Sequence, residues 1–458
     1  MVRHFSQRIH FVGIGGAGMS GLAELLHCYG HTVSGSDRSL SAATARLASL
    51  GIRIQSGHAP DFVKDARLLV YSSAIRENNP ERVYAREHRI AELRRADALG
   101  QIMRSFTALC VAGTHGKTTT TSLVGAILSE AGLRPTVLVG GTLCAEGAPV
   151  IVGDSGIMVA EADEFDRSFL ALYPGVAIIT NVQADHLDCY KDLEEIKNAF
   201  VAFAGRVPFY GAVVCCSDDR GVRDVLPRIE RTCVTYGTGP DADYTARNIQ
   251  FTDGKASFDA CRRGARLGPV RLSIPGMHNV VNALGALAAA TEIGVPFKAV
   301  RQALANFAGV KRRFEIVGRE RGVTVIDDYA HHPAEIAATL EAARCSGFKR
   351  ITAVFQPHLF SRTRDFMDDF AARLSKADAV IVTDIYNARE EPIPGVTAAG
   401  IVEKLRALGH ADACYIARKE TIAKAVADRA ARGDAVVFMG AGDITETAGE
   451  LVEVLHHG

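Results

Sequence analysis

The 458-residue chain has no tryptophan, no Cys-x-x-Cys pair and no apolar run long enough to cross a bilayer. Its ten cysteines are scattered, which argues against a disulfide framework or a zinc site and favours a reducing compartment. Neither charge sign is in excess, because 52 Lys and Arg residues balance 52 Asp and Glu residues. We therefore expect a cytoplasmic protein, without a nucleic acid or a membrane as its partner.

The chain is too long for one ordinary domain, and its apolar runs suggest three α/β units. We expect boundaries near 1–106, 107–312 and 313–458. Short apolar runs that alternate with helical stretches predict parallel strands in each unit. The expected strands include residues 9–12, 68–73, 107–111, 157–160, 176–180, 211–216, 323–326, 351–355, 379–382 and 435–439.

The most informative motif is a glycine-rich turn, Gly113-Thr114-His115-Gly116-Lys117-Thr118-Thr119. It lies between the expected strand at 107–111 and a helix-like run at 122–131. A turn of this kind points backbone N–H groups at a phosphate chain, and the helix dipole adds positive potential. Lys117 would add a full charge and Thr118 a hydroxyl for Mg²⁺. The turn therefore predicts binding of ATP or a similar nucleotide, although Val111 stands where the standard P-loop has its first glycine.

A second glycine motif, Gly13-Ile14-Gly15-Gly16-Ala17-Gly18, follows the first expected strand. Asp37 lies about twenty residues further on, where a dinucleotide fold places its ribose-binding acid. Taken alone, this pattern predicts NAD. The pyrophosphate of a nucleotide sugar would be held equally well by the same backbone. Ser72 and Ser73 end another expected strand and form a plausible ligand edge.

Polar clusters follow several other expected strands, where open α/β sheets bind ligands. Glu161 is a candidate for holding Mg²⁺ beside the phosphates, and His186, between two acids, is as well explained by a loop salt bridge as by a metal. In the third unit, the candidates are the string from Asp327 to Pro333 and the group around Arg362. Arginine there suits a carboxylate or a phosphate.

Several motifs together, spread in order over nearly the whole chain, resemble the Mur ligases, ATP-dependent enzymes that add amino acids in peptidoglycan synthesis. They are the turn at 113–119, Glu161-Ala162-Asp163-Glu164, Thr180-Asn181, Asp185-His186-Leu187-Asp188, His278-Asn279-Val280-Val281-Asn282, Arg312-Arg313-Phe314 and Asp327-Asp328-Tyr329-Ala330-His331-His332-Pro333. The resemblance is greatest to the alanine-adding branch, through residues 15–21, 34–37, 355–358, 362–365 and 391–395.

The resemblance implies three α/β domains: a Rossmann-like domain for a UDP-sugar, a central P-loop domain for ATP, and a Rossmann-like domain that binds the amino acid and closes. It implies that L-alanine is joined to the lactyl carboxylate of UDP-N-acetylmuramate through an acyl phosphate, with ATP and Mg²⁺. The protein is expected to be a monomer or a weak homodimer.

The same resemblance assigns the site residues. Lys117, His331 and Arg362 are the catalytic candidates. The ATP contacts are residues 113–119 with Asn279, Asn282, Arg313 and Asp328. The metal ligands are Thr118, Glu161 and His186. The substrate contacts are Gly15, Gly16, Ala17, Gly18, Met19, Ser20, Ser36, Asp37, Ser72, Ser73, Tyr329, His331 and Arg362.

Two departures from the family pattern stand out, Leu359 where many relatives have arginine and Phe165 where they have serine. Three rival readings stay open at this point. They are a recycling ligase that joins a whole tripeptide to the same sugar nucleotide, a nicotinamide-dependent oxidoreductase, and a nucleotide-binding regulatory protein without turnover.

Overall fold

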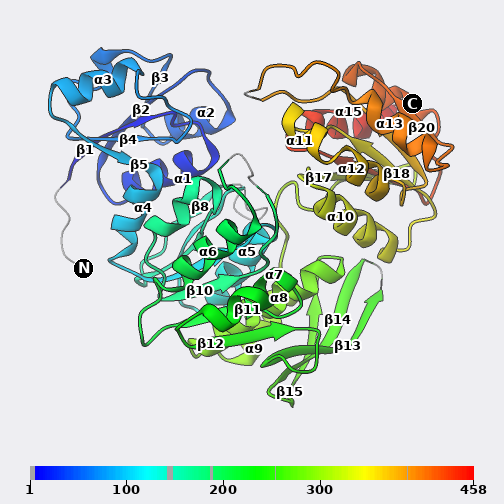
Figure 1. Ribbon diagram of the computed structural model, residues 1–458, viewed down its shortest axis with the longest axis horizontal. Helices are drawn as coiled ribbons and strands as arrows, with labels where there is room; N and C mark the ends of the chain where they lie inside the picture. The colour runs from blue at the N-terminus through cyan, green and yellow to red at the C-terminus, as the bar shows by residue number, and fades with distance from the viewer. Residues whose placement is uncertain (1–5, 142–147, 186–188, 253, 389, 458) are drawn as a thin grey trace. The chain divides into compact units, whose positions relative to one another are not determined.

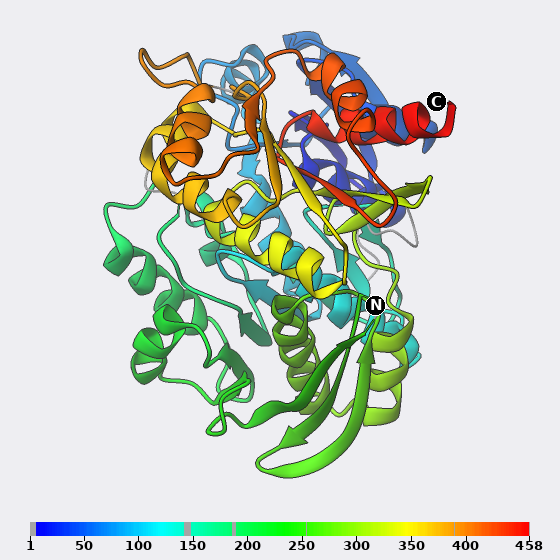
Figure 2. The ribbon, with the colours of Figure 1, turned by 90° about the vertical axis from the view of Figure 1, so that its right-hand side faces the viewer.

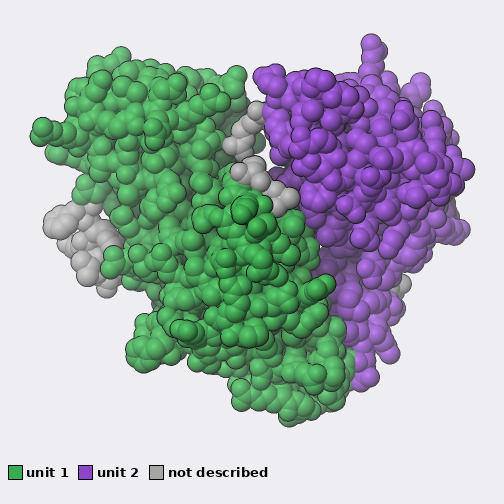
Figure 3. Space-filling model, viewed as in Figure 1, with its two compact units in different colours: residues 1–247, 259–268, 281–304 green, residues 248–258, 269–280, 305–458 purple. Residues whose placement is uncertain are grey.

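A computed structural model describes residues 6–141, 148–185, 189–252, 254–388 and 390–457. The chain separates into two units, each described by itself (Figure 3). Unit 1 contains residues 1–247, 259–268 and 281–304, and unit 2 contains residues 248–258, 269–280 and 305–458. None of the helices in these described ranges combines the length and hydropathy that a membrane span needs.

The first sheet, drawn in blue in Figure 1, has five parallel strands in the order β3-β2-β1-β4-β5. The strand order reverses between β1 and β4, and such a switch point is where open parallel sheets bind ligands. The elements are β1 (Arg8–Val12), α1 (Ala17–Cys28), β2 (Thr32–Asp37), α2 (Ala42–Ser49), β3 (Arg53–Ser56), β4 (Leu68–Tyr71), α3 (Pro80–Glu87), β5 (Ala91–Arg94) and α4 (Arg95–Met103).

The second sheet has ten strands in the order β15-β14-β13-β12-β11-β10-β6-β9-β7-β8. Its buried middle strands are near-continuous apolar runs, as expected for strands covered on both faces. The elements are β6 (Thr107–Ala112), α5 (Lys117–Glu130), β7 (Thr136–Leu138), β8 (Val150–Ile151), β9 (Ile157–Glu161), β10 (Val176–Ile179), α6 (Leu193–Ala204), β11 (Ala212–Cys216), α7 (Arg220–Val225), β12 (Cys233–Gly237), β13 (Tyr244–Thr252), β14 (Lys255–Arg262), β15 (Ala265–Leu272), α8 (Met277–Glu292) and α9 (Phe297–Asn306).

Strand β6 lies between β9 and β10 and is parallel to both. The carboxyl ends of these three strands therefore meet at one edge, where the glycine-rich turn lies beside the polar residues that follow β9 and β10. The long strands β13 to β15, seen as neighbouring green ribbons in Figure 2, have no counterpart among the sequence predictions.

The third sheet, in unit 2, has the order β16-β17-β21-β18-β19-β20, and only its edge pair β16–β17 is antiparallel. Alternate strand residues face opposite layers. Phe355 packs in a core with α10, α12 and α13, and its neighbour Val354 packs in a core with α14 and α15. The sheet within residues 313–458 is thus covered by helices on both faces, as expected for a Rossmann-like domain. Its elements are β16 (Glu315–Glu320), β17 (Val323–Asp328), α10 (Pro333–Cys345), β18 (Ile351–Phe355), α11 (Phe360–Asp365), α12 (Met367–Leu374), β19 (Ala379–Val382), α13 (Ala399–Ala407), β20 (Ala413–Tyr415), α14 (Ile422–Ala427), β21 (Ala435–Met439) and α15 (Ile444–His457).

Candidate active site

The glycine-rich turn between β6 and α5 depends on two glycines. Gly113 has φ 142° and Gly116 has φ 80°, values that favour glycine. A Cβ at Gly113 would also lie 1.9 Å from Thr180 Oγ1. Helix α5 begins at Lys117, directly after Gly116, and not at residue 122 as the apolar periodicity predicts. Lys117, Thr118 and Thr119 therefore form the first helical turn, where N–H groups have no partner within the helix.

Two residues after β10 fix the shape of this turn. Thr180 Oγ1 donates to His115 O at 2.6 Å, and Asn181 Nδ2 donates to the same oxygen at 3.0 Å. Asn181 Oδ1 accepts the His115 N–H at 2.8 Å. The N–H and C=O of His115 are thus both bonded by the neighbouring strand end, which orders the turn before any ligand is bound.

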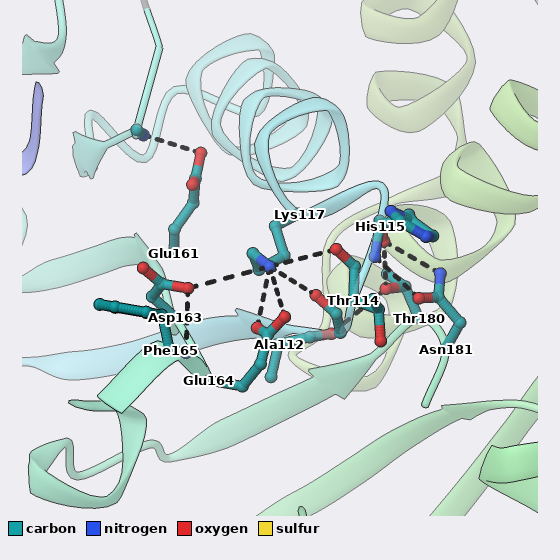
Figure 4. Close-up of polar contacts among 12 residues, drawn as sticks. Ala112, Thr114, His115, Lys117, Glu161, Asp163, Glu164, Phe165, Thr180 and Asn181 are labelled. Carbon is teal, nitrogen blue, oxygen red and sulfur yellow. Dashed lines mark hydrogen bonds and ion pairs between the residues drawn. The ribbon is translucent and has the colours of Figure 1, made fainter. Parts of the chain in front are cut away.

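The Lys117 ammonium lies at the centre of the polar contacts in Figure 4. Its Nζ donates to Glu164 Oε2 at 2.8 Å and Oε1 at 3.0 Å, and to Gly113 O at 2.8 Å. Burial opposes the charge on Lys117, but Glu164, Asp163 and Glu161 outweigh it, so the pKa of the ammonium is raised. Lys117 is therefore a charged group held beside the turn.

Two of the expected metal ligands follow neighbouring parallel strands, Glu161 at the end of β9 and Thr118 in the helix after β6. Glu161 ends β9 opposite Val111, and its Oε1 accepts the Gly140 N–H at 2.8 Å. Thr118 is in the first turn of α5 and is 8% exposed. A carboxylate and a hydroxyl are hard oxygen donors that suit Mg²⁺. His186 lies outside the described residues, and within them no group of three or more His, Cys, Asp and Glu side chains gathers as a metal site.

The expected ATP contacts outside the turn fall in both units. Asn282, in unit 1, packs against the turn, because a Cβ at Gly116 would lie 2.6 Å from its Oδ1. Asn279, Arg313 and Asp328 belong to unit 2. Asp328 is 7% exposed, and burial raises its pKa to about 6 although Arg313 and backbone N–H groups favour the charged form.

The glycine loop of the first sheet is held by Asp37, whose Oδ2 accepts the Gly15 N–H at 2.8 Å. Ser72 is brought to the same place, because a Cβ at Gly13 would lie 3.4 Å from Ser72 Cβ. Ser73 follows it and is exposed. These expected substrate contacts therefore meet at the switch point between β1 and β4.

The other expected substrate contacts of this unit are in and beside the loop. Gly16 is the N-cap of α1, and Ala17 and Gly18 begin that helix. Met19 and Ser20 are buried in its first turn, at 2% and 4% exposure. Ser36 is fully buried, and its hydroxyl donates to Glu81 Oε2 at 2.6 Å.

Residues near this loop that sequence reasoning missed are Arg95, Glu81, His10 and His58. A Cβ at Gly18 would lie 2.6 Å from Arg95 Nη1, so the guanidinium lies directly over the loop. Glu81 is fully buried and accepts from the Ala59 N–H at 3.2 Å, with His58 Nδ1 at 3.3 Å. Arg95 directly follows β5, a strand that the sequence analysis did not expect, so no sequence signal pointed to it.

In unit 2, the expected residues Tyr329 and His331 follow β17, and Arg362 follows β18. His331 Nδ1 lies 2.9 Å from Tyr329 O and 3.3 Å from Glu335 Oε2. Burial lowers the pKa of His331, and the positive charge of Arg362 acts in the same direction. The imidazole is therefore held in its neutral form near an arginine.

Two further features shape this part of unit 2. The guanidinium carbons of Arg312 and Arg313 lie 5.0 and 5.3 Å from the centre of the Tyr329 ring. Leu359, one of the two departures noted above, has φ 72° and ψ 138°, which is strained for a residue with a Cβ. The turn that leads into Arg362 is thus held in an unfavourable backbone conformation by its surroundings.

Fold and site together define a class: a nucleotide-binding α/β protein with three sheets, a P-loop at the end of a central parallel strand, and a second glycine loop at a switch point. Family models match the Mur ligase family, catalytic domain at 8–107, the Mur ligase middle domain at 111–290, and the Mur ligase, glutamate ligase domain at 312–442. The chain belongs to the Mur ligase family.

Similar proteins cover nearly the whole chain. A UDP-N-acetylmuramate–L-alanine ligase of Sorangium cellulosum (strain So ce56) is 51% identical over 97% of this chain and 95% of its own length. The crystal structure of a UDP-N-acetylmuramate-alanine ligase from Thermotoga maritima is 32% identical, with a TM-score of 0.84 over 98% of this chain and 99% of that one. A murein peptide ligase from Psychrobacter arcticus 273-4 is 26% identical, with a TM-score of 0.71 over 99% of each chain.

Proposed function

We propose that this protein is an ATP-dependent ligase that joins L-alanine to the lactyl carboxylate of UDP-N-acetylmuramate, giving UDP-N-acetylmuramoyl-L-alanine, ADP and phosphate. The observation that carries the proposal is the ordered turn with a charged Lys117 at the end of β6, in a chain 51% identical to a relative of that name. The reaction serves peptidoglycan precursor synthesis.

The first chemical step places an oxyanion against an anionic phosphate. The substrate carboxylate attacks the γ-phosphorus of ATP, the bond to the β–γ bridging oxygen breaks, and an acyl phosphate and ADP form. Backbone N–H groups of residues 113–119 and the Lys117 ammonium would stabilise the charge that develops on the transferred phosphoryl group. Thr118, Glu161 and His186 are the residues proposed to hold Mg²⁺, which neutralises phosphate charge when bound.

The sugar nucleotide is assigned to the first sheet. Its diphosphate would lie on the loop from Gly15 to Gly18, at the N-terminus of α1, where N–H groups and the helix dipole favour an anion. Arg95, over Gly18, adds a full positive charge. Ser36, Asp37, Ser72 and Ser73 complete the proposed contacts, and we keep residues 1–106 as the domain for this substrate.

The second step needs a neutral amine to attack the acyl phosphate, so the L-alanine ammonium must lose a proton. His331 is the proposed base, because its lowered pKa keeps the imidazole neutral near pH 7. Arg362 would bind a carboxylate or the acyl phosphate, with Tyr329 beside it. Asn279, Asn282, Arg313 and Asp328 are proposed to contact ATP, and residues 107–312 and 313–458 are the proposed ATP and amino-acid domains.

The test is phosphate release with ATP, Mg²⁺ and UDP-N-acetylmuramate, measured separately with L-alanine, L-serine, glycine and the tripeptide substrate of a recycling ligase. Release with L-alanine and none with tripeptide is expected. Release with tripeptide alone would replace this proposal by the recycling activity. Absence of release with every acceptor, in protein that binds nucleotide, would argue for a regulatory protein.

A further inference from the structure

The carboxylate of Glu164 accepts hydrogen bonds from the Lys117 ammonium, the group proposed to bind a phosphate. Lys117 Nζ carries three protons and already has four acceptors within 3.3 Å: two oxygens of Glu164, and the carbonyls of Gly113 and Thr114. A phosphate oxygen can gain this ammonium only if one of these acceptors gives way. The carbonyls belong to the turn itself, so the carboxylate is the acceptor that can be exchanged.

The backbone of Glu164 is fixed in place by its surroundings. Its side chain is 3% exposed, and the buried Tyr190 donates its hydroxyl to Glu164 O at 2.6 Å. The Arg167 N–H donates to the same carbonyl at 3.0 Å. The carboxylate is therefore held at the turn by a pinned backbone and is not a solvated side chain that meets Lys117 by chance.

The negative charges around the Lys117 ammonium outnumber its single positive charge. Asp163 Oδ1 lies 4.0 Å from Lys117 Nζ, and Glu161 also acts on the Lys117 charge. One ammonium thus faces three carboxylates, a net charge of minus two for these four groups. A metal-free nucleotide brings several more negative charges to the same place, which is unfavourable at short range.

We propose that Glu164 is an internal counter-anion of Lys117, which competes with the nucleotide phosphates and makes the site select the magnesium-bound nucleotide over the free one. Free nucleotide must displace a buried carboxylate to reach the Lys117 ammonium, and it brings no cation of its own to offset the repulsion from the nearby carboxylates. Mg²⁺ bound with the nucleotide would supply positive charge that offsets this repulsion for the phosphates and for the Glu164 carboxylate. This inference rests on the proposed function, because it assumes that the turn binds ADP and ATP.

The test is calorimetric titration of the full chain with ADP, once in excess Mg²⁺ and once in EDTA. Glu164→Gln keeps the shape of the side chain and removes its charge. Free ADP is expected to bind this variant about tenfold more tightly than the wild type. This is about the free energy of one hydrogen bond to a charged group, which ADP no longer has to displace from Lys117. Binding of magnesium-ADP is expected to change by less than about threefold, since a competitor and a favourable contact are lost together.

Two other variants control the result. Glu24→Gln removes a carboxylate of similar burial, which is 8% exposed and paired with Arg46 at 2.7 Å, and should leave both affinities unchanged. Glu164→Asp keeps the charge but shortens the side chain, and should give an intermediate ratio of the two affinities. It also keeps the test available if the Gln variant does not fold.

Three outcomes are distinguishable. A lower ratio of free-ADP to magnesium-ADP dissociation constants in Glu164→Gln supports the inference. An unchanged ratio in a well-folded variant overturns it and leaves the proposed ligase function intact. Failure of the wild type to bind magnesium-ADP at all would overturn the proposed function itself.

Discussion

The pairing of Lys117 with Glu164 predicts that the two residues stabilise unit 1 only together. Replacing Lys117 by Met removes the ammonium and leaves a carboxylate at 3% exposure without its cation. Removing one partner of a buried ion pair costs about 3–5 kcal/mol, because the other charge stays desolvated. Lys117→Met should therefore unfold more easily than the wild type, besides losing its turnover.

Partial exposure at this position sets the expected size of the cost. The Lys117 side chain is 16% exposed and that of Glu164 is 3% exposed, so water reaches the vacated position only in part. The destabilisation is therefore expected at the lower end of this range, about 3 kcal/mol.

The assay is urea unfolding at pH 7 followed by far-UV circular dichroism, since the chain has no tryptophan for fluorescence. The double variant Lys117→Met/Glu164→Gln carries no buried charge at this position. It should recover most of the stability. A single variant as stable as the wild type at pH 7, or a double variant no better than the single, would refute the reasoning.

Four further predictions concern other parts of the site. Gly116→Ala places a Cβ at φ 80°, 2.6 Å from Asn282 Oδ1. It should lower the free energy of unfolding by about 1–2 kcal/mol and weaken ADP binding measured by calorimetry. An unchanged stability and affinity would mean that the turn is not constrained. Arg95→Ala should raise the KM for UDP-N-acetylmuramate about tenfold without changing that for ATP, and equal effects on both would contradict its assignment to the diphosphate. His331→Gln should lower kcat about 100-fold, with the KM for ATP unchanged, and a normal kcat in the variant would exclude this base. In the wild type, the pKa of His331 is lowered from its ordinary value of 6.5, so the midpoint of any activity loss caused by its protonation should lie below pH 6.5. Asp328 has a pKa raised from 3.8 to about 6, so it favours the folded state below pH 4, and this contribution is lost as pH rises through 6. In urea unfolding, the stability of the wild type relative to Asp328→Asn should fall by about 3 kcal/mol over that range. A constant difference between the two proteins would contradict the pKa shift.

The sequence by itself determined the local structure of the site. Apolar runs such as Thr107 to Val111 predict buried strands because their side chains must leave water. The glycines of the turn at 113–119 predict where the chain bends toward a phosphate, because glycine tolerates the φ angles that such a turn needs. The motifs that indicated the family are also short local segments, so they and their order can be read directly from the sequence.

Tertiary structure decided which of these local structures meet. Lys117 and Glu164 are 47 residues apart, and Thr180 reaches His115 across 65 residues. These contacts exist because β9, β6 and β10 are neighbouring parallel strands whose carboxyl ends share an edge. A sequence read position by position cannot rank such distant pairs, since many carboxylates could meet the lysine with equal local propensity. Only the order of strands in the sheet, which depends on packing both of its faces, selects Glu164.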